Sequence, residues 1–190
     1  MLDHVILYEK YRPKTLDECI LTKNLKATFQ GFVDSGKIPN LVLAGPTGMG
    51  KTSIAHVLCD TLGYDKLVIN GSLDRNIDTL RNEIQSFAST LSIEGKRKCV
   101  IIDEADYLNV TSTQPALRNF METFSDNCSF ILTCNYKMKI MQPIRDSRSI
   151  LIEFNIMTSE EKKQLFIDWY KNVLKILEAE SITYNKDAIV

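Results

Sequence analysis

Short apolar runs alternate with helical patterns along residues 1–154. Apolar residues recur on one helical face in Lys51–Leu62, in Asp78–Leu91 and from Thr113 onward. The runs between them are apolar throughout, as in strands that are buried on both faces. The five predicted strands are Leu41–Ala44, Leu67–Asn70, Cys99–Ile102, Phe130–Thr133 and Ile150–Phe154. This alternation predicts an α/β fold with a five-stranded, mostly parallel sheet between helices.

Local signals mark the ends of these helices. Gly63 is predicted to stop the first helix, and Asp78 is a candidate N-cap of the second. Pro115 lies in the first turn of the third helix, where its missing N–H costs nothing.

The pattern changes after Phe154. Thr158 and Glu161 have the spacing of a capping box, and an apolar stripe follows them at helical intervals. These features predict a long helix outside the sheet, and Asn185 is a candidate N-cap of one more helix. We therefore expect an α/β domain at 1–154 and a helical subdomain at 155–190, cut inside its second helix.

Composition is ordinary for a globular protein and leaves the function open. Of 190 residues, 44% are hydrophobic and 25% are charged, and the net charge is −1. Bulk charge therefore predicts neither a nucleic-acid binder nor an acidic scaffold, so any positive surface must be local. Five cysteines without C-x-x-C spacing and two histidines argue against a zinc module and indicate buried thiols. No signal peptide or membrane-length apolar run is found, so we expect an intracellular protein.

A phosphate-binding loop follows the first predicted strand. Residues 45–52 read GPTGMGKT, a complete G-x-x-x-x-G-K-[ST] motif that runs directly into a predicted helix. Its glycines let successive amides point inward at the positive end of that helix. Lys51 is predicted to reach the β and γ phosphates, and the Thr52 hydroxyl to hold Mg²⁺. The predicted ATP-binding residues here are Gly45, Pro46, Thr47, Gly48, Met49, Gly50, Lys51, Thr52 and Ser53.

Acidic residues end another predicted strand. Asp103 and Glu104 follow a buried apolar run, and open α/β sheets bind ligands at the carboxyl ends of their strands. Asp103 is predicted to contact Mg²⁺, and Glu104 is the candidate general base for the attacking water. Asn135 follows a third strand, where it either orients water or a phosphate oxygen or is only a turn former.

Five motifs in this order resemble clamp-loader ATPases of the AAA+ P-loop superfamily. They are Glu9–Pro13, the phosphate loop, Asp103–Asp106, Thr133–Asn135 and Ser147–Arg148. The resemblance spans essentially the whole chain. Within the family, the chain is similar to replication factor C small subunits and to the large clamp-loader subunits of T-even-type phages. It implies an AAA+ nucleotide-binding domain followed by a partial helical lid.

The resemblance also implies roles for single residues. Asn135 matches the first sensor, and Arg148 matches the arginine finger, which acts on ATP held by a neighbouring subunit. The segment implied to enclose adenine and ribose comprises Tyr8, Glu9, Lys10, Tyr11, Arg12 and Pro13, with Ile20 downstream. Arg75, in a segment that resembles the link between DNA and Glu104, is the candidate switch. Three residues are weaker candidates for contacts with DNA or with a neighbouring subunit: Arg81, Gln114 and Arg118. The alternative for each is an ordinary solvated helix residue.

The chain departs from the family pattern at the finger. Members commonly have Ser-Arg-Cys, whereas here the segment is Asp146–Ser149, with one extra residue after Pro143. Arg145 is therefore a rival for the finger role of Arg148. The second sensor arginine and the oligomerisation collar of family members are expected beyond residue 190.

The resemblance implies an ATPase subunit that opens a sliding clamp and loads it onto primer-template DNA. ATP and Mg²⁺ are the implied cofactors. The implied partners are other clamp-loader subunits, the clamp and primer-template DNA. We expect the subunits to form a hetero-oligomeric ring or spiral, a pentamer. The expected location is the cytoplasm, that of the host for a phage protein, or the nucleus in a eukaryote, without a membrane partner.

Two alternatives remain open from the sequence. One is another AAA+ DNA-remodelling ATPase, either a branch-migration helicase or an initiator loader, against which Glu9–Pro13 and Ser147–Arg148 argue. The other is a nucleotide-binding structural subunit that does not hydrolyse ATP. The intact set of Lys51, Asp103 and Glu104 argues against that alternative.

Overall fold

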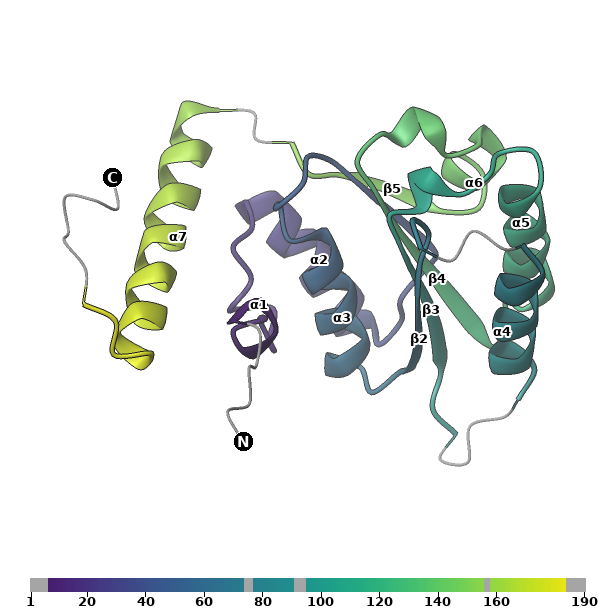
Figure 1. Ribbon diagram of the computed structural model, residues 1–190, viewed down its shortest axis with the longest axis horizontal. Helices are drawn as coiled ribbons and strands as arrows, with labels where there is room; N and C mark the ends of the chain where they lie inside the picture. The colour runs from purple at the N-terminus through teal and green to yellow at the C-terminus, as the bar shows by residue number, and fades with distance from the viewer. Residues whose placement is uncertain (1–6, 74–76, 91–94, 156–157, 184–190) are drawn as a thin grey trace.

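Five parallel strands form one sheet in the order β2-β3-β4-β1-β5 (Figure 1). This computed structural model describes residues 7–73, 77–90, 95–155 and 158–183. The predicted strands are confirmed, and their ends differ from the prediction by at most two residues. The strands are β1 (Leu41–Ala44), β2 (Asp65–Asn70), β3 (Lys98–Asp103), β4 (Cys128–Cys134) and β5 (Ile150–Glu153).

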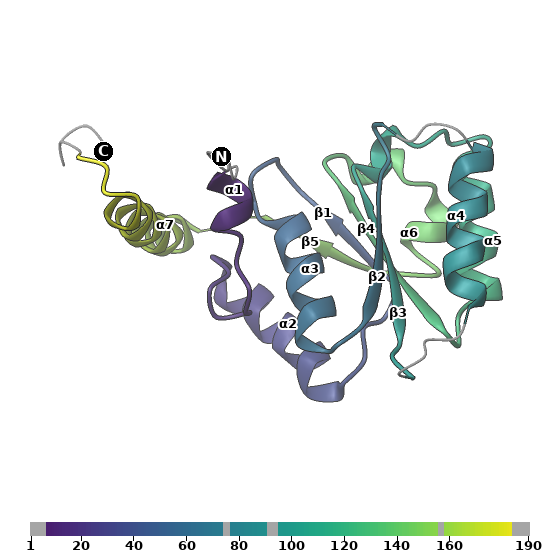
Figure 2. The ribbon, with the colours of Figure 1, turned by 60° about the horizontal axis from the view of Figure 1, so that its bottom comes forward.

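Helices cover both faces of the sheet. Helices α2 and α3 lie on one face, and α4 and α5 lie on the other (Figure 2). The helices are α1 (Leu7–Lys10), α2 (Lys23–Ser35), α3 (Lys51–Thr61), α4 (Ile77–Ser89), α5 (Thr113–Thr123), α6 (Gln142–Arg145) and α7 (Ser159–Ala179). Two short 3₁₀ turns, η1 (Ala105–Tyr107) and η2 (Lys137–Lys139), follow β3 and β4. The three-layer arrangement predicted from the alternating pattern is confirmed.

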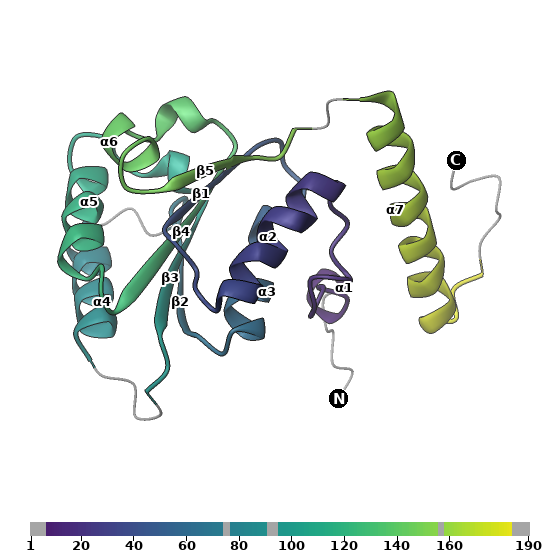
Figure 3. The ribbon, with the colours of Figure 1, turned by 180° about the vertical axis from the view of Figure 1, so that it is seen from behind.

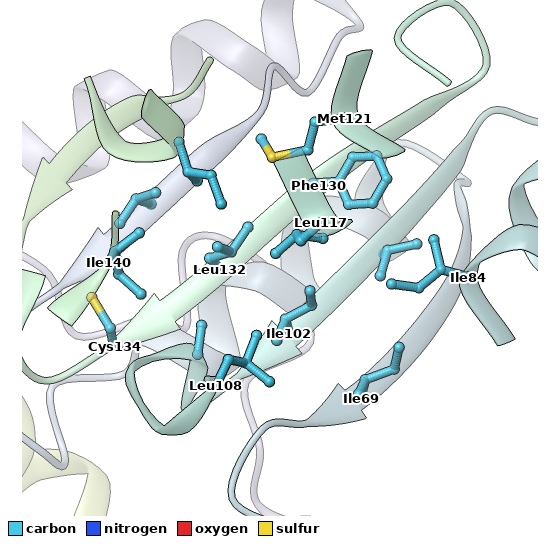
Figure 4. Packing of buried hydrophobic residues seen from close by; sticks show 14 of the residues in the cluster. Ile69, Ile84, Ile102, Leu108, Leu117, Met121, Phe130, Leu132, Cys134 and Ile140 are labelled. Atoms are coloured by element: carbon cyan, nitrogen blue, oxygen red, sulfur yellow. The ribbon is translucent and has the colours of Figure 1, made fainter. Parts of the chain in front are cut away.

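Buried side chains fill the space between the sheet and each helical layer. On the α4 and α5 side, Ile84 and Leu117 pack with Phe130 and Leu132 of β4 (Figure 4). Full burial of such side chains contributes roughly 1.5–3 kcal/mol each relative to exposure. All five cysteines are buried and free, as expected for thiols inside the fold: Cys19, Cys59, Cys99, Cys128 and Cys134.

Helix α2 is an element that the prediction lacked. Thr22 caps its start by accepting a hydrogen bond from Leu25 N at 3.4 Å, and Gly36 ends it with φ +66°. The proposed N-cap role of Asp78 is wrong, because Ile77 already begins α4 and Asp78 lies inside its first turn. A carboxylate in that turn still interacts favourably with the positive end of the helix.

Helix α7 stands away from the sheet, beyond α1 and α2 (Figure 3). The predicted capping box is confirmed, because Thr158 and Glu161 bond reciprocally at 3.1 Å and 3.0 Å. None of the side chains of α7 is buried, and Phe166 and Trp169 remain 50% and 45% exposed. Just past its end, Glu180 accepts hydrogen bonds of 2.5 Å from both Lys10 and Tyr11. Within the described ranges, no helix has the length and apolar character needed to cross a bilayer.

Candidate functional site

The order of the strands brings three polar segments to one edge of the sheet. Strand β4 lies between β1 and β3, with Ala44 beside Cys134 and Ile102 beside Leu132. Parallel strands end at the same edge, so the loop after β1, Asp103 after β3 and Asn135 after β4 become neighbours. The structure thus brings together the main predicted site residues.

The phosphate loop has the backbone shape that its glycines predict. Gly45, Gly48 and Gly50 have φ values of +153°, +77° and +82°, which residues with a Cβ rarely adopt. Gly50 is the N-cap of α3 and provides no side-chain cap, so the first amides of the helix are left for another acceptor. Such an N-terminus favours an anion, and a phosphate group satisfies both its donors and its dipole.

Lys51 is held inside the phosphate loop. The side chain is largely buried, at 8% exposure. Its Nζ donates to Gly45 O and Pro46 O at 2.7 Å each and to Asn135 Oδ1 at 3.1 Å. Burial lowers the pKa of Lys51, and the negative charges of Asp103 and Asp106 oppose that shift. The ammonium group is therefore poorly solvated, and its three donors are used by acceptors within the protein.

Asp103 gathers two hydroxyl groups. Thr52 Oγ1 donates to Asp103 Oδ1 at 2.7 Å, and Thr133 Oγ1 donates to the same oxygen. Hydroxyl and carboxylate oxygens are the hard ligands that Mg²⁺ prefers, usually together with waters and substrate phosphates. The pair formed by Thr52 and Asp103 therefore fits the predicted Mg²⁺ site by its chemistry.

Glu104 has a strained backbone that fixes the end of β3. Its φ is +53°, and its N–H donates to Thr133 Oγ1 at 3.1 Å. A left-handed backbone conformation is energetically unfavourable for any residue that has a Cβ. Residues held in this conformation cluster at functional sites. Glu104 thus has a backbone conformation of the kind found at functional sites.

Gly71 is a residue of this site that the sequence analysis did not single out. Its N–H donates to Asp103 O at 2.8 Å. A Cβ at this position would lie only 2.8 Å from Glu104 O, so a larger residue would displace the strand end. The signal in the sequence was a lone glycine after a strand, which is typical of a close backbone approach.

An apolar cavity of about 380 Å³ adjoins the loop. Pro13 and Ile20, predicted to enclose adenine and ribose, lie in its wall, as do Gly48, Met49, Gly50 and Ser53 of the loop region. Its other lining residues are Glu18, Cys19, Leu21, Lys162, Leu165, Phe166, Trp169 and Asn172. An apolar cavity of this size beside a phosphate-binding loop suits the flat base of a nucleotide.

The rest of the N-terminal segment lies in or beside α1. Lys10 and Tyr11 bond to Glu180 rather than to the loop. Tyr8 lies within α1, Glu9 is exposed and Arg12 is half-buried. The segment therefore connects α7 to the wall of the cavity.

Both candidate fingers are paired within the chain. Arg148 Nε donates to Glu122 Oε1 at 2.6 Å, and its Nη1 donates to Pro143 O at 3.0 Å. The hydrogen bond from Arg148 lowers the pKa of Glu122. Arg145 instead bonds to its neighbour Asp146, at 2.7 Å from Nε. Among the described residues, neither arginine has a hydrogen bond to the phosphate loop.

The structure contradicts the proposed contact role of Gln114. Its side chain is 1% exposed, and its Nε2 donates to Leu108 O at 3.2 Å and to Lys139 O at 2.9 Å. Its Oε1 accepts from Met141 N at 2.7 Å. The amide is used entirely inside the protein, so it cannot face DNA or a neighbouring subunit in this state.

The three arginines proposed alongside Gln114 differ in their surroundings. Arg118 lies on α5, and its Nε is 3.5 Å from Glu122 Oε1, the carboxylate oxygen that also accepts from Arg148. Arg81 is exposed on α4. Arg75 lies outside the described residues.

Comparisons with known proteins agree with this geometry. Residues 41–156 match the ATPase family associated with various cellular activities (AAA). The large sliding-clamp-loader subunits of Escherichia phage RB69 and Enterobacteria phage T4 are each 40% identical to this chain over 178 residues, which cover 93% of it and 55% of each relative. The replication factor C small subunit of Archaeoglobus fulgidus is 37% identical over 190 residues, covering 97% of this chain and 57% of the relative.

The chain spans little more than half the length of these relatives. Among solved structures, the Thermotoga maritima RuvB Holliday junction branch migration motor superposes with a TM-score of 0.66. It is 24% identical, and the match covers 83% of this chain and 53% of that one. That likeness concerns the fold.

Proposed function

Because the chain belongs to the ATPase family associated with various cellular activities, we propose that it binds Mg²⁺-ATP and hydrolyses it as a subunit of a sliding-clamp loader. The names of its relatives support the second half of this proposal. The observation that carries the first half is a junction of two hydrogen bonds. Lys51 contacts Asn135, and the next residue, Thr52, contacts Asp103.

Each residue of this junction has a role in the proposed reaction. Lys51 would exchange its two loop carbonyls for oxygens of the β and γ phosphates, which are stronger acceptors. Thr52 and Asp103 would hold Mg²⁺, which neutralises charge that develops on the phosphates. Glu104 would accept a proton from the attacking water, and Asn135 would orient that water or a γ-phosphate oxygen.

The cation that completes the site would come from another subunit. Arg148 and Arg145 are both paired with carboxylates in their own chain. An arginine supplied in trans makes hydrolysis depend on assembly, since the transition-state charge is stabilised only when a neighbour is in place. We assign this role to Arg148, which must first leave Glu122, and we keep Arg145 as the rival.

The proposal extends to domains and partners. It divides the chain into a nucleotide-binding domain at 1–154 and a lid at 155–190, with the cavity beside α7 for the base. The partners would be other loader subunits in a spiral, the clamp and primer-template DNA, in the compartment where the DNA is copied. Exposed Arg81 and helix N-termini would contact the phosphate backbone without reading bases.

Loss of the loop lysine tests the proposal. In the full-length protein with its partner subunits, ATPase activity stimulated by DNA and clamp should vanish in Lys51→Ala. Lys37→Ala, which removes an exposed lysine, is the matched control and should retain activity. Equal turnover in both variants would overturn the ATPase assignment.

Separate arms test the partners. Omitting the clamp distinguishes a clamp loader from another DNA-remodelling ATPase, because only the loader should respond to it. Salt titration of DNA binding should give a steep negative slope if phosphate contacts dominate. A flat slope would remove the proposed grip on the DNA backbone.

A further inference from the structure

Asp106 is a buried carboxylate that the roles proposed above do not use. It lies in η1 and is 6% exposed. Its Oδ2 accepts a hydrogen bond of 3.3 Å from Tyr136 N, and among the described residues its Oδ1 has no hydrogen-bond partner. An incompletely paired carboxylate inside a protein is destabilising. Its place is therefore better explained by activity than by stability.

Asp106 contacts the segment that directly follows β4. Tyr136, whose N–H it accepts, directly follows Asn135, so this bond restrains the backbone where the Asn135 side chain leaves the strand. The charge of Asp106 also raises the pKa of Lys51 against the effect of burial, which places it within electrostatic reach of the loop. The backbone next to Asn135 is thus restrained by this one carboxylate.

The need for such a restraint changes when ATP binds. In this structure Asn135 Oδ1 accepts a hydrogen bond from Lys51 at 3.1 Å, which ties the side chain to the loop. In the function proposed above, Lys51 turns to the phosphates, and that tie would then weaken. The bond between Asp106 and Tyr136 N then remains to keep the segment in place.

Building on the ATPase function proposed above, we propose that Asp106 is a positioning residue for hydrolysis, which holds the backbone of Asn135 and Tyr136 so that Asn135 faces the γ-phosphate. It does not touch the nucleotide. Its effect is therefore expected on kcat rather than on ATP affinity, because positioning within the site matters most in the transition state.

Asp106→Asn is the most informative change, because it keeps the shape but replaces a charged acceptor with a weaker neutral one, which loosens the bond to Tyr136 N. In the full-length protein with partner subunits and primer-template DNA, kcat should fall about tenfold while the Kd for ATP changes less than about threefold. The melting temperature should stay the same or rise, since an unpaired buried charge is removed. Exposed Asp126→Asn is the control and should change none of the three.

A double-mutant cycle with Asn135→Ala shows whether Asp106 acts through that residue. The two changes together should lower kcat hardly more than Asn135→Ala alone. An unchanged kcat in Asp106→Asn, a parallel fall of kcat and melting temperature, or multiplied effects in the double variant would each overturn the inference. A wild-type protein that neither binds nor hydrolyses ATP would instead remove the proposed function on which it rests.

Discussion

Thr52 Oγ1 donates a hydrogen bond of 2.7 Å to Asp103 Oδ1, joining the first turn of α3 to the end of β3. Two residues that are 51 positions apart thus place a hydroxyl and a carboxylate on one small region of the site. Both are hard oxygen ligands, so a cation bound there would contact the helix and the strand together.

Thr52→Val should abolish most of the Mg²⁺ dependence of ATP binding. Valine has nearly the same shape but no oxygen, whereas Thr52→Ser keeps the ligand and serves as the control. We expect Mg²⁺ to tighten ATP binding about tenfold or more in the wild type and in Thr52→Ser, and little in Thr52→Val. Titration of ATP with Mg²⁺ or with a chelator measures this, and equal Mg²⁺ dependence in all three would refute the ligand role.

Mixing variants tests the arginine finger. Arg148→Ala and Glu104→Gln should each lose activity about a thousandfold as single variants in an assembled loader. Their mixture should recover part of it, because an intact Glu104 can meet an intact Arg148 from a neighbour. If Arg145→Ala complements Glu104→Gln in this way and Arg148→Ala does not, the finger is Arg145.

Gln114→Ala should destabilise the fold. It leaves Leu108 O, Lys139 O and Met141 N without their buried partner, at an expected cost of about 2–4 kcal/mol in the free energy of unfolding. Gln85→Ala, at an exposed position of α4, should change it by less than about 0.5 kcal/mol. Urea denaturation compares the two, and similar values would show that the buried bonds contribute little.

Gly71→Ala should impair hydrolysis more than ATP binding. The new methyl group would meet Glu104 O at 2.8 Å and shift the proposed base. Gly31→Ala is the matched control, because a Cβ there meets nothing within 4 Å, and it should raise helix stability by about 0.5–1 kcal/mol. Single-turnover hydrolysis and ATP titration separate the two effects; equal kcat in both variants would show that the strand end tolerates the methyl group.

The contact between α7 and the N-terminal segment should weaken in acid. The hydrogen bond from Lys10 lowers the pKa of Glu180 below its usual 4.5. A carboxylate whose pKa is lowered on folding stabilises the fold above its usual pKa, and the contribution is lost as pH falls through the lowered value. The protection factors of the α7 amides, which are corrected for the intrinsic pH dependence of hydrogen exchange, should therefore fall in acid in the wild type.

Glu180→Gln provides the control for this pH effect. Its α7 should exchange faster at neutral pH and respond less to acid, because the charge is already absent. The effect should be small and salt-dependent, as for other exposed ion pairs. The same acid response in the variant would assign the change to other carboxylates.

Much of this protein could be predicted from local pattern. The loop at 45–52, the five strands, α3, α5 and the capping box of α7 depend on residues that are close in the chain, and periodicity reports such neighbours directly. Helix α2 carried usable signals in Thr22 and Gly36, but its mixed composition made them easy to miss. The N-cap of α4 was misplaced because helix ends depend on single hydrogen bonds.

Only the tertiary structure decided which distant residues meet. The sequence by itself determined that the chain has a phosphate loop, an acidic strand end and a polar strand end. It did not determine that β4 lies between β1 and β3, which places Asn135 against Lys51. Nor did it show that Gln114 is buried or that Glu122 holds Arg148. The physical reason is that strand order and helix packing depend on contacts between residues far apart in the chain. The periodicity of a single segment carries no information about such contacts.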